Sequence, residues 1–575
     1  MPVAFRHALL AAPLLLAPVM LGTSYGLTAA GTGAGRVPSG CAADNGGLTL
    51  PPGFCASVFA DNLGHTRHLV VAGDGTVYVN TWSGRYFRNT PDAPAGGFVV
   101  ALRDRDGDGV ADSQERFGSS LAKDGHGGTG IALWQGGLFV EEHDTIARYA
   151  RKTGDLAPKG APTLVLSGLP MSGDHPMHPF AIRADGTLLV NSGSASNACE
   201  SPNRQPGAKG LNPCVEAETR GGIWAYRADK AGQKFAAADR WAKGIRNTGG
   251  ISIDSAGRIF GTQHGRDQLG QNWSNFYSTQ DGVELPAEIL FSPHKGADFG
   301  WPNCYFNGFE MQHKLAPEYG GDGKVQGACA AKDKPVAAFP AHWAPNDVAI
   351  YTGKTFPAAY GQGAFIAFHG SWNRAPAPQD GYLVAFQPLK DGKANGAWIR
   401  FADGFAGAFK EPGRAMHRPA GLAVGPDGAL YIADDVRGRI WRVTYRGSLA
   451  APLTAAAKAD TGGVMAAGKS GVLPAGITAA QVALGRAIYQ GQAKGGTCAG
   501  CHGSDGRGSM AGGSLTGPDF AWSDGSVDGL AATITKGVEK ARKVSGAMPA
   551  LGGSALTPED VKAVAAYVWT LSHGG

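Results

Sequence analysis

The chain has 575 residues, which is long enough for more than one hydrophobic core. Its 89 glycines and 35 prolines, against only 17% charged residues, favour short strands and tight turns over long helices. The 52 basic and 47 acidic residues leave a net charge of +5 without a run of Lys or Arg, which argues against a nucleic-acid-binding protein.

The first thirty residues have the layout of a secretory signal peptide. Arg6 and His7 precede an apolar stretch from Ala8 to about Leu21, and small residues follow. The apolar stretch is short for a membrane span. We therefore expect residues 1–30 to direct export and to be removed, with a retained anchor or an ordinary buried helix as alternatives. No later segment has the pattern of a transmembrane helix.

Residues 31–446 contain a recurring phrase in which a turn with glycine leads into a run of β-forming residues. Its six copies are GDGTVYVN at 73, QGGLFVEEH at 135, ADGTLLVNSGS at 184, SAGRIFGTQHG at 255, GQGAFIAFHGS at 361 and PDGALYIADD at 426. Each predicts a hairpin turn followed by a buried inner strand. Six copies at blade-sized intervals predict a mainly β fold, a six-bladed β-propeller, with a β-sandwich as the alternative.

Polar residues follow several of these strands, as in NSGSASN, TQHGRDQ, FHGSWNR and IADDVRGR. In a propeller, the loops at one end of the strands converge on the central channel, where polar groups can surround a ligand. We therefore expect the functional site at the ends of the repeats.

An acidic segment, DRDGDGVADSQE from 104 to 115, matches the twelve-residue calcium loop D-x-D-x-D-G-x5-E, with Gly109 at its sharp turn. The strand-like GGFVVALR before it excludes a helix-flanked EF-hand. We expect a structural Ca²⁺ here, with a solvated acidic turn as the alternative. The expected ligands are Asp104, Asp106, Asp108, Asp112 and Glu115.

Six of the eight cysteines form three close neighbours along the chain: Cys41 with Cys55, Cys199 with Cys214, and Cys304 with Cys329. Local pairing closes the shortest loops and is therefore the pairing we expect. Disulfides imply an oxidising compartment, so we expect a periplasmic or secreted protein.

Beyond residue 446 the β pattern stops. Residues 447–476 are rich in Ala and Gly and predict a flexible linker. Residues 477–575 contain two stretches with helical spacing, ITAAQVALGRAIYQGQ and LTPEDVKAVAAYVWTLSHGG, the second with a Thr557 cap and Pro558 in its first turn. These two predicted helices bracket the last pair of cysteines.

That pair stands in the motif Cys-Ala-Gly-Cys-His. Cys498 and Cys501 are spaced to form thioethers to one haem, and His502 supplies an axial imidazole. We expect Met548, in SGAMPALGG, to be the second axial ligand, which would raise the reduction potential. A zinc site is the alternative, but two further ligands do not follow at a suitable spacing. The segment resembles a class I cytochrome c, which implies one covalent haem that transfers electrons.

Five stretches carry a resemblance to a second family: SGDHPMHPFAIRADGTLLVNSGSASNAC, GIRNTGGISIDSAGRIFGTQHGRDQ, FPAHWAPNDVAIYTGKTFP, FIAFHGSWNR and HRPAGLAVGPDGALYIADD. In their order and placement they resemble the pyrroloquinoline-quinone (PQQ) sugar dehydrogenases of the soluble glucose dehydrogenase and sorbosone dehydrogenase type, over most of residues 45–445. The resemblance implies a six-bladed propeller that holds PQQ and Ca²⁺ over its channel and oxidises an aldose or a related carbonyl sugar.

The resemblance also implies two catalytic residues. His175 matches the family's base, which takes the proton of the substrate hydroxyl as hydride moves to the quinone, and His178 is the fallback. Where the family's glucose enzyme has an acid that orients this histidine, the chain has Ser194, which makes the base weaker unless Asp174 or another group helps. Arg246 matches the arginine that stabilises negative charge on the quinone oxygen.

Cofactor contacts follow from the same resemblance. Asn247 is expected to hydrogen-bond PQQ, and the backbone carbonyls of Gly265 and Arg266 to bind its calcium ion, with Asp267 as a further candidate. The basic groups expected at the cofactor carboxylates are Arg374, Arg418 and, as a looser match, His342. Two tryptophans in polar loops either stack on the sugar or pack in the core: Trp82 and Trp273.

Together these observations predict a secreted quinohaemoprotein. It would oxidise a sugar or aldehyde at PQQ and pass electrons through the C-terminal haem to an external acceptor such as a cytochrome, a copper protein or a quinone chain. Two other functions stay open, a calcium-dependent propeller lactonase and a non-catalytic propeller that carries a cytochrome. The haem argues against the lactonase, because hydrolysis needs no electron outlet. The sequence does not choose among glucose, sorbosone, other aldoses, and simple aldehydes or alcohols.

Overall fold

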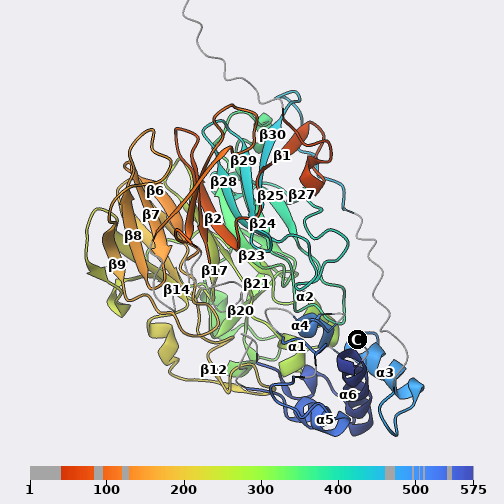
Figure 1. Ribbon diagram of the computed structural model, residues 1–575. Coiled ribbons are helices and arrows are strands. Elements are labelled where there is room, and N and C mark those ends of the chain that lie inside the picture. The colour runs from red at the N-terminus through yellow and green to blue at the C-terminus, as the bar shows by residue number, and fades with distance from the viewer. Residues whose placement is uncertain are drawn as a thin grey trace, which may run out of the picture. The chain divides into compact units, whose positions relative to one another are not determined.

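Six sheets follow one another along the chain (Figure 1), in a computed structural model that describes most of the sequence. The described residues are 40–82, 95–118, 128–459, 473–494, 496, 498–503, 506–508, 512–517, 519–539 and 547–573. The expected signal peptide, residues 1–30, lies outside them.

Each sheet has four main strands that pair antiparallel with their neighbours. The first sheet contains β2 (Thr66–Val71), β3 (Val77–Thr81), β4 (Val99–Arg103) and β5 (Ser113–Phe117). The second contains β6 (Ile131–Trp134), β7 (Gly137–Glu142), β8 (Thr145–Ala150) and β9 (Thr163–Ser167), and β15 (Gln233–Lys234) pairs with β9 in parallel. The third contains β10 (Phe180–Ile182), β11 (Thr187–Ser192), β14 (Gly222–Arg227) and β16 (Arg240–Lys243).

The fourth sheet contains β17 (Thr248–Ile253), β18 (Ile259–Gln263), β19 (Glu288–Phe291) and β22 (Ala337–Phe339). The fifth contains β23 (Pro345–Ile350), β24 (Gly363–Phe368), β25 (Leu383–Lys390) and β27 (Ile399–Ala402), and β26 (Lys393–Ala394) pairs with the end of β25. The sixth contains β28 (Pro419–Val424), β29 (Leu430–Asp434), β30 (Ile440–Tyr445) and β1 (Phe54–Ala60). Two small hairpins lie in the loops, β12 (Glu200–Ser201) with β13 (Lys209–Gly210), and β20 (Cys304–Asn307) with β21 (Gln312–Leu315).

The six sheets close into a ring. Their first strands contact one another in the order β2, β6, β10, β17, β23 and β28, and β28 in turn contacts β2. The sheet of β28 is completed by β1, which pairs with β30 so that Phe54 lies opposite Tyr445. Joining the first and last strands in one sheet fastens the ring and protects its edges. The predicted six-bladed β-propeller is confirmed.

The recurring phrase marks the turn between the first and second strands of each sheet. It leads into β3, β7, β11, β18, β24 and β29, which are the second strands and not the innermost ones. In three copies an aspartate side chain closes the turn: Asp185 Oδ1 accepts the N–H of Thr187 at 2.9 Å, and the equivalent bonds of Asp74 and Asp427 measure 3.2 and 3.1 Å.

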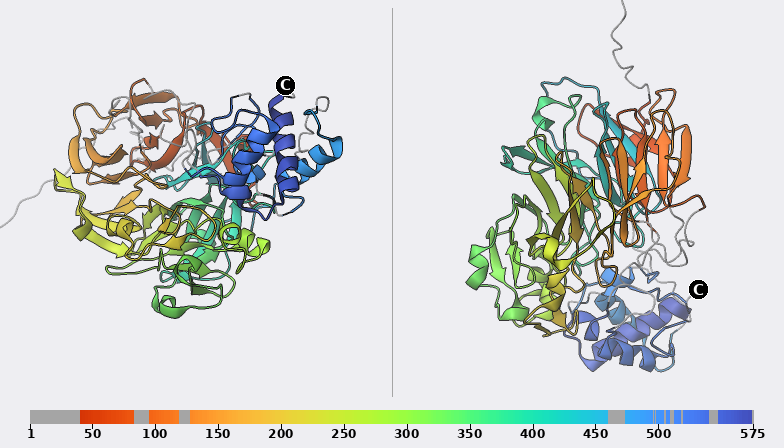
Figure 2. Two further views of the ribbon diagram at one scale, coloured as in Figure 1. Left: turned by 90° about the horizontal axis from the view of Figure 1, so that it is seen from below. Right: turned by 90° about the vertical axis from the view of Figure 1, so that its left-hand side faces the viewer.

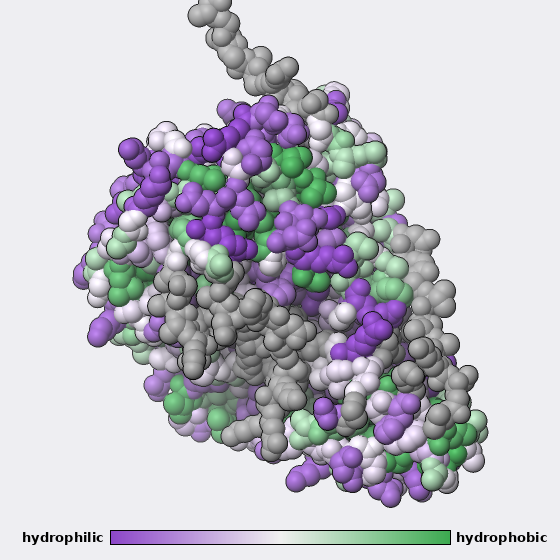
Figure 3. Space-filling model, in the orientation of Figure 1, coloured by the Kyte–Doolittle hydropathy of each residue, from purple (hydrophilic) through white to green (hydrophobic). Residues whose placement is uncertain are grey.

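The second strands form the centre of the core. β3, β7, β24 and β29 are buried at every position. In β24, Phe365 packs into the cluster shared with the sheet of β28, whereas Ile366 on the other face packs into the cluster shared with the sheet of β17. Burial on both faces explains why these strands read as continuous runs of β-formers and small residues without strict alternation. The outer face of the propeller seen in Figure 3 is largely hydrophilic, with hydrophobic residues in small patches.

Two short helices lie in the loop after β18, and four lie in the C-terminal region. Their bounds are α1 (Leu269–Asn272), α2 (Thr279–Glu284), α3 (Ala479–Tyr489), α4 (Cys498–His502), α5 (Val527–Lys536) and α6 (Pro558–His573). The two predicted terminal helices are therefore present. Thr478 and Gln481 form a capping box at the start of α3, and Thr557 Oγ1 accepts the N–H of Asp560 at 3.2 Å at the start of α6.

Helices α3 and α5 both pack against α6 (Figures 1 and 2). Gly485 permits the close approach of α3, because a Cβ atom at this position would lie 1.9 Å from the carbonyl oxygen of Ala563 on α6. A T-shaped pair of Tyr489 and Tyr567, with ring centroids 5.2 Å apart, adds to this core. The prediction of a helical cytochrome c region after the propeller is confirmed.

All three expected disulfides form: Cys41–Cys55, Cys199–Cys214 and Cys304–Cys329. The first part of the expected linker is anchored to the propeller, since the N–H of Ala456 donates to the carbonyl of Arg400 at 2.8 Å. Residues 460–472 of the linker lie outside the described residues. Among the helices of the described part of the chain, none has the length and hydrophobicity that a membrane crossing requires.

Candidate functional site

A cavity lies where the first strands of the sheets begin and the second strands end. Its lining includes Arg246 and Asn247 before β17, His264 after β18, His369 after β24, and Arg418 before β28. The segments TQHGRDQ and FHGSWNR, which follow the second strands, supply part of this lining. The expectation that polar strand ends converge on one site is thus met by these loops.

Four buried arginines give the cavity its charge: Arg67, Arg204, Arg246 and Arg418. Asp174 and Asp267 each lie within 3.0 Å of a guanidinium nitrogen of Arg204, and Arg67 pairs with Asp435 at 2.6 Å. Arg204 and Arg246 hold the pKa of Asp267 well below the ordinary range, although burial acts in the opposite direction. The pKa of Asp435 is lowered in the same way, first by His369 and then by Arg67 and Arg418.

A fourth carboxyl group, Glu288, is kept neutral at pH 7 because burial raises its pKa to about 8. Four guanidinium groups therefore face three ionised carboxylates, and a net positive charge remains. Arg67 Nε is buried without a hydrogen-bond partner among the described residues. The cavity is built for an anionic ligand with several acceptor oxygens.

His175 has its two ring nitrogens in different environments. Nδ1 lies 2.8 Å from the carbonyl oxygen of Ser194 and 3.0 Å from its Oγ. Because a carbonyl can only accept, Nδ1 carries the proton, and Nε2 keeps its lone pair. Burial, with the nearby Arg246 as the second cause, holds the pKa of His175 well below its ordinary value. His175 is therefore a neutral imidazole that lines the cavity.

His178, the alternative base, does not line the cavity. Its side chain is fully buried, with Nδ1 3.1 Å from Glu141 Oε1 and Nε2 3.1 Å from the carbonyl oxygen of Pro170. Glu141 also accepts the backbone N–H groups of Thr129 and Gly130. Both ring nitrogens are engaged in structural contacts, so the structure favours His175. Asp174, a proposed helper of His175, accepts a hydrogen bond from Arg204 Nε at 2.9 Å, and its charge acts to raise the pKa of His175.

Arg246 is fixed by four hydrogen bonds. Nε and Nη2 donate to the backbone and side-chain oxygens of Asn197, each at 3.0 Å. Nη1 donates to the carbonyl of Gly265 at 2.8 Å, and Nη2 donates to Asp267 Oδ2 at 3.0 Å. Arg246 lies close to Asn247 in the same lining. A guanidinium held at this many points has little freedom to reorient when a ligand binds.

Gly193 allows two expected site residues, His175 and Asn247, to lie close together. A Cβ atom on Gly193 would lie 2.5 Å from Asn247 Oδ1 and 2.6 Å from His175 Cβ. Asn247 Nδ2 is itself 3.4 Å from His264 Nδ1. Burial and Arg246 lower the pKa of His264 to about 3, so this ring is also neutral.

The residues of the turn expected to bind calcium, Gly265 and Arg266, form hydrogen bonds with other residues in the structure. The carbonyl of Gly265 accepts a hydrogen bond from Arg246, which places a cation next to the expected ligand atom. The side chain of Arg266 points to Glu318, with Nη1 2.5 Å from both carboxylate oxygens. Calcium at Gly265 and Arg266 stays a prediction, and no step below depends on it.

The remaining expected contacts divide into two groups. Arg418, His342 and Trp82 line the cavity. Arg374 does not, because its guanidinium donates to the carbonyls of Val283 and Ala341 behind the loops. Trp273 is also outside: it packs in a core cluster and donates to Glu318 Oε1 at 2.8 Å. The core alternative for Trp273 is therefore correct. Arg374 lies outside the lining of this cavity, and its expected cofactor contact stays a prediction.

The acidic loop brings three of its five expected ligands together. Oxygen atoms of Asp104, Asp106 and Asp108 lie within 4.8 Å of one another. Asp112 and Glu115 do not belong to this group; Asp112 accepts the N–H of Arg105 at 2.7 Å, and Glu115 lies exposed on β5. A structural calcium ion on this loop stays a prediction.

The haem motif lines a second, largely apolar cavity. Cys498, Cys501, His502 and Met548 all contribute to its wall. His502 Nδ1 lies 2.7 Å from the carbonyl oxygen of Gly513, so this nitrogen is the protonated one and Nε2 is left to coordinate iron. Burial lowers the pKa of His502, which keeps the imidazole neutral as a ligand must be. These residues fit a covalent haem with histidine and methionine ligands.

Several lining residues were not singled out from the sequence. They are Arg67, Arg204, His264, Glu288, His369 and Trp372. Three of them stand in segments that the pattern did mark as strand ends, namely His264, His369 and Trp372. Arg204 and Glu288 carry no such signal, because they come from a long loop and from the first position of β19.

Comparisons with known proteins agree with this geometry. A family model described as TrAA12-like matches residues 48–446, and one described as cytochrome c oxidase, cbb3-type, subunit III matches residues 480–568. An uncharacterized protein of Borreliella burgdorferi is 30% identical over 207 residues, 36% of this chain and 48% of that protein. A pyrroloquinoline quinone-dependent pyranose dehydrogenase of Coprinopsis cinerea is 28% identical over 240 residues, 34% of this chain and 30% of that protein. The chain thus spans about half or less of these relatives' length.

Solved structures share the propeller. The calcium structure of the Trichoderma reesei family AA12 enzyme is 17% identical, with 69% of this chain and 97% of that chain covered at a TM-score of 0.55. The holo form of the pyranose dehydrogenase PQQ domain from Coprinopsis cinerea is 18% identical, with the same coverage and a TM-score of 0.52. At these identities the likeness shows the fold. The family model covers more than half of the residues, and the chain therefore belongs to the TrAA12-like family, with a cytochrome c region after its propeller.

Proposed function

We propose that this protein is a PQQ-dependent sugar dehydrogenase whose electrons leave through its own c-type haem. The proposal is carried by one observation: a neutral imidazole, His175, lines the same cavity as four buried arginines. A base and a polyanion-binding surface are what an oxidation by a carboxylated quinone needs. The family match and the name of the Coprinopsis cinerea relative support the cofactor and the substrate class.

The cavity residues fit PQQ, which carries three carboxylates. Arg418 donates to the carbonyls of His369 and Gly370 through Nε and Nη2, which holds its guanidinium at the wall of the cavity. The unpartnered Nε of Arg67 offers a further donor. Bound PQQ would supply a two-electron acceptor for hydride. Arginine suits this task because its planar fork binds carboxylates with two parallel hydrogen bonds.

His175 would act as the base. Its Nε2 would take the proton of the substrate hydroxyl while hydride leaves the carbon that carries this hydroxyl. Because Nδ1–H stays bonded to Ser194, the ring is held in the tautomer that this step requires. Arg246 uses four of its five N–H groups in fixed contacts, so one remains to donate to an oxygen that gains negative charge.

The haem region would provide the electron outlet. Cys498 and Cys501 would attach the haem, and His502 and Met548 would hold its iron. A haem held by two such protein ligands would supply one-electron transfer and would leave no open site for substrate chemistry. The final acceptor is then an external protein or quinone.

We place the protein outside the cytoplasm and leave its sugar unspecified. Three disulfides support an oxidising compartment, since such bonds are rare where thiols are kept reduced. Substrate choice depends on the shape of the loops around the cavity, so glucose, sorbosone and other aldoses are all tested below.

The test is haem reduction. Holoprotein with covalent haem is loaded with PQQ, with and without Ca²⁺, and the haem absorption is followed after addition of aldoses, sorbosone, aldehydes and alcohols. We expect reduction with at least one sugar and none without PQQ. The proposal fails if the haem stays oxidised across this panel. Hydrolysis of lactones by the same preparation would instead establish the lactonase function.

A further inference from the structure

The loop from Ser194 to Arg204, which follows β11, contacts both groups that the proposed reaction uses. At its start, Ser194 provides two acceptors for His175 Nδ1–H. Three residues later, Asn197 provides two acceptors for Arg246. Asn197 Oδ1 also accepts the N–H of Asp267 at 2.8 Å. One short segment therefore sets the position of the base and of the arginine.

The hydroxyl of Ser194 has its direction fixed. Its O–H donates to the carbonyl of Ser196 at 2.6 Å. A serine has a single hydroxyl proton, so Ser194 Oγ can only accept from His175. The carbonyl of Ser194 accepts from the same Nδ1–H, so both oxygens of Ser194 favour this tautomer. The contact with Ser196 thus helps to hold Ser194 in the position in which both oxygens accept from His175.

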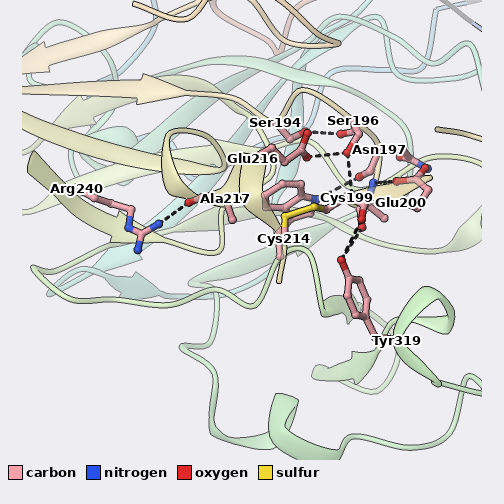
Figure 4. The surroundings of a disulfide bond; sticks show 12 residues. Ser194, Ser196, Asn197, Cys199, Glu200, Cys214, Glu216, Ala217, Arg240 and Tyr319 are labelled. Carbon is pink, nitrogen blue, oxygen red and sulfur yellow. Dashed lines mark hydrogen bonds between the residues drawn. A yellow bond between two sulfur atoms is a disulfide. The ribbon is translucent and has the colours of Figure 1, made fainter. Parts of the chain in front are cut away.

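Ser196 is held in turn by a disulfide-linked neighbour (Figure 4). Its Oγ donates to Glu216 Oε1 at 2.7 Å and accepts the N–H of Cys199 at 2.8 Å. Cys199 is bonded to Cys214, which is the N-cap of the 3₁₀ helix η2 (Val215–Glu218) that carries Glu216. The disulfide therefore fixes both contacts of the Ser196 hydroxyl. Cys199 makes one contact through its own N–H, and Cys214 precedes the helix whose Glu216 makes the other.

The conformation of the loop needs such a constraint. Cys199 has a φ of +53°, in the left-handed region that non-glycine residues rarely adopt. Its carbonyl accepts the N–H of Leu211 at 2.8 Å. Tyr319 Oη donates to the same carbonyl of Cys199 at 3.3 Å (Figure 4). Ser194, Asn197 and Ala198 are all buried, so the loop leads directly from the disulfide to the cavity wall.

We propose that the Cys199–Cys214 disulfide, Glu216 and Ser196 form a brace that fixes the tautomer of His175 and the position of Arg246. These are positioning residues, because they act through Ser194 and Asn197 and do not line the cavity themselves. The inference rests on the proposed function for its effect on catalysis. Its effect on the His175 ring does not depend on any cofactor.

The first test is nuclear magnetic resonance of ¹⁵N-histidine-labelled holoprotein without added PQQ, with His175→Asn used to assign the signals of His175. We expect the unaltered protein to show the Nδ1–H form, and the double variant Cys199→Ser/Cys214→Ser to show a mixture of both tautomers. The matched control is Cys41→Ser/Cys55→Ser, which removes a disulfide attached to β1, in the sheet of β28, whereas the loop follows β11 in the sheet of β10. An unchanged His175 signal in the first variant overturns the brace.

The second test is catalytic and uses haem reduction with PQQ and a substrate sugar. We expect Cys199→Ser/Cys214→Ser to lower kcat about tenfold or more with a small change in KM, whereas the control stays within about twofold. Glu216→Gln keeps an acceptor oxygen and should retain most of the rate that Glu216→Ala loses. Equal kcat values in both disulfide variants would overturn the brace. If no sugar reduces the haem in any variant but the His175 signal still changes, the brace stands and the proposed function falls.

Discussion

Glu288 Oε2 lies 2.7 Å from the backbone nitrogen of Gly265, while Oε1 of the same carboxyl lies 3.1 Å from the nitrogen of Ala344. One buried side chain on β19 thus ties together the two loops that carry Gly265 and His342 into the cavity lining. Burial outweighs these two N–H donors and raises the pKa of Glu288 to about 8.

This relationship predicts a pH-dependent stability. In the unfolded chain Glu288 loses its proton near its ordinary pKa of about 4.3, whereas in the folded protein it keeps it up to about pH 8. Between these values the folded state binds more protons, so the free energy of unfolding falls as pH rises. Glu288→Gln removes this dependence. We expect the unfolding temperature of Glu288→Gln minus that of the unaltered protein to be larger at pH 8 than at pH 5. An equal difference at both pH values would contradict the raised pKa of Glu288.

His175 is expected to control the rate. Replacing it in His175→Asn should lower kcat about 10²- to 10⁴-fold, because no base is then available for the substrate hydroxyl. The matched control is His143→Asn, since His143 has a half-exposed side chain and a φ of +56° that asparagine also adopts readily. Stopped-flow haem reduction measures both, and a similar loss in the two variants would argue against His175.

The pH profile of the same reaction gives a second check on this base. Burial and Arg246 hold the pKa of His175 well below its ordinary range. Nε2 therefore stays unprotonated through neutral and mildly acidic solution, and kcat should remain flat until the pH falls below about 6.5, the ordinary value for histidine. An acid limb centred at or above that value would contradict the buried, neutral ring.

The arginines offer a test of which basic groups bind the cofactor. Arg418→Ala should weaken PQQ binding by about 10- to 100-fold, because it removes a charged donor from the cavity wall. Arg374→Ala should leave PQQ affinity within about twofold, since its guanidinium serves the carbonyls of Val283 and Ala341. Equilibrium titration with PQQ measures both dissociation constants. The reverse order of effects would show that Arg374 turns into the site when the cofactor binds.

Gly193→Ala should disturb the site through size alone. The new methyl group would lie 2.5 Å from Asn247 Oδ1 and 2.6 Å from His175 Cβ, so one of these side chains must move. We expect a loss of about 1–3 kcal/mol in stability and a larger relative loss of kcat. Gly73→Ala is the control, because a Cβ atom there meets no atom within 4 Å. Thermal unfolding and haem reduction of both variants decide the point.

The haem ligands predict an electrochemical result. Met548→His replaces a thioether with an imidazole, which should lower the reduction potential of the haem. The absorption bands of a methionine-ligated haem should disappear in the same variant. A redox titration that gives an unchanged potential would show that another residue is the sixth ligand.

The sequence could not show which candidate side chains line the cavity, and the reason is physical. His175 and His178 stand three positions apart in DHPMH, and only the fold turns one to the cavity and the other to Glu141. Arg374 and Trp273 stand in polar segments that resemble the rest of the site, yet their side chains bond behind the loops. Arg204 lies 42 residues before Arg246 and becomes its neighbour only because both bind Asp267.

The sequence by itself determined the features that depend on local patterns. Six turns followed by buried strands specify a propeller, because each phrase encodes its own hairpin, and the spacing of Cys498, Cys501 and His502 specifies a haem site within one helical turn. Tertiary structure decided the charge of the cavity, which nitrogen of His175 is protonated, and which residues hold His175 in place. They depend on loops from different sheets that meet at one end of the ring, and on burial that changes pKa values, and neither is encoded in any single stretch of chain.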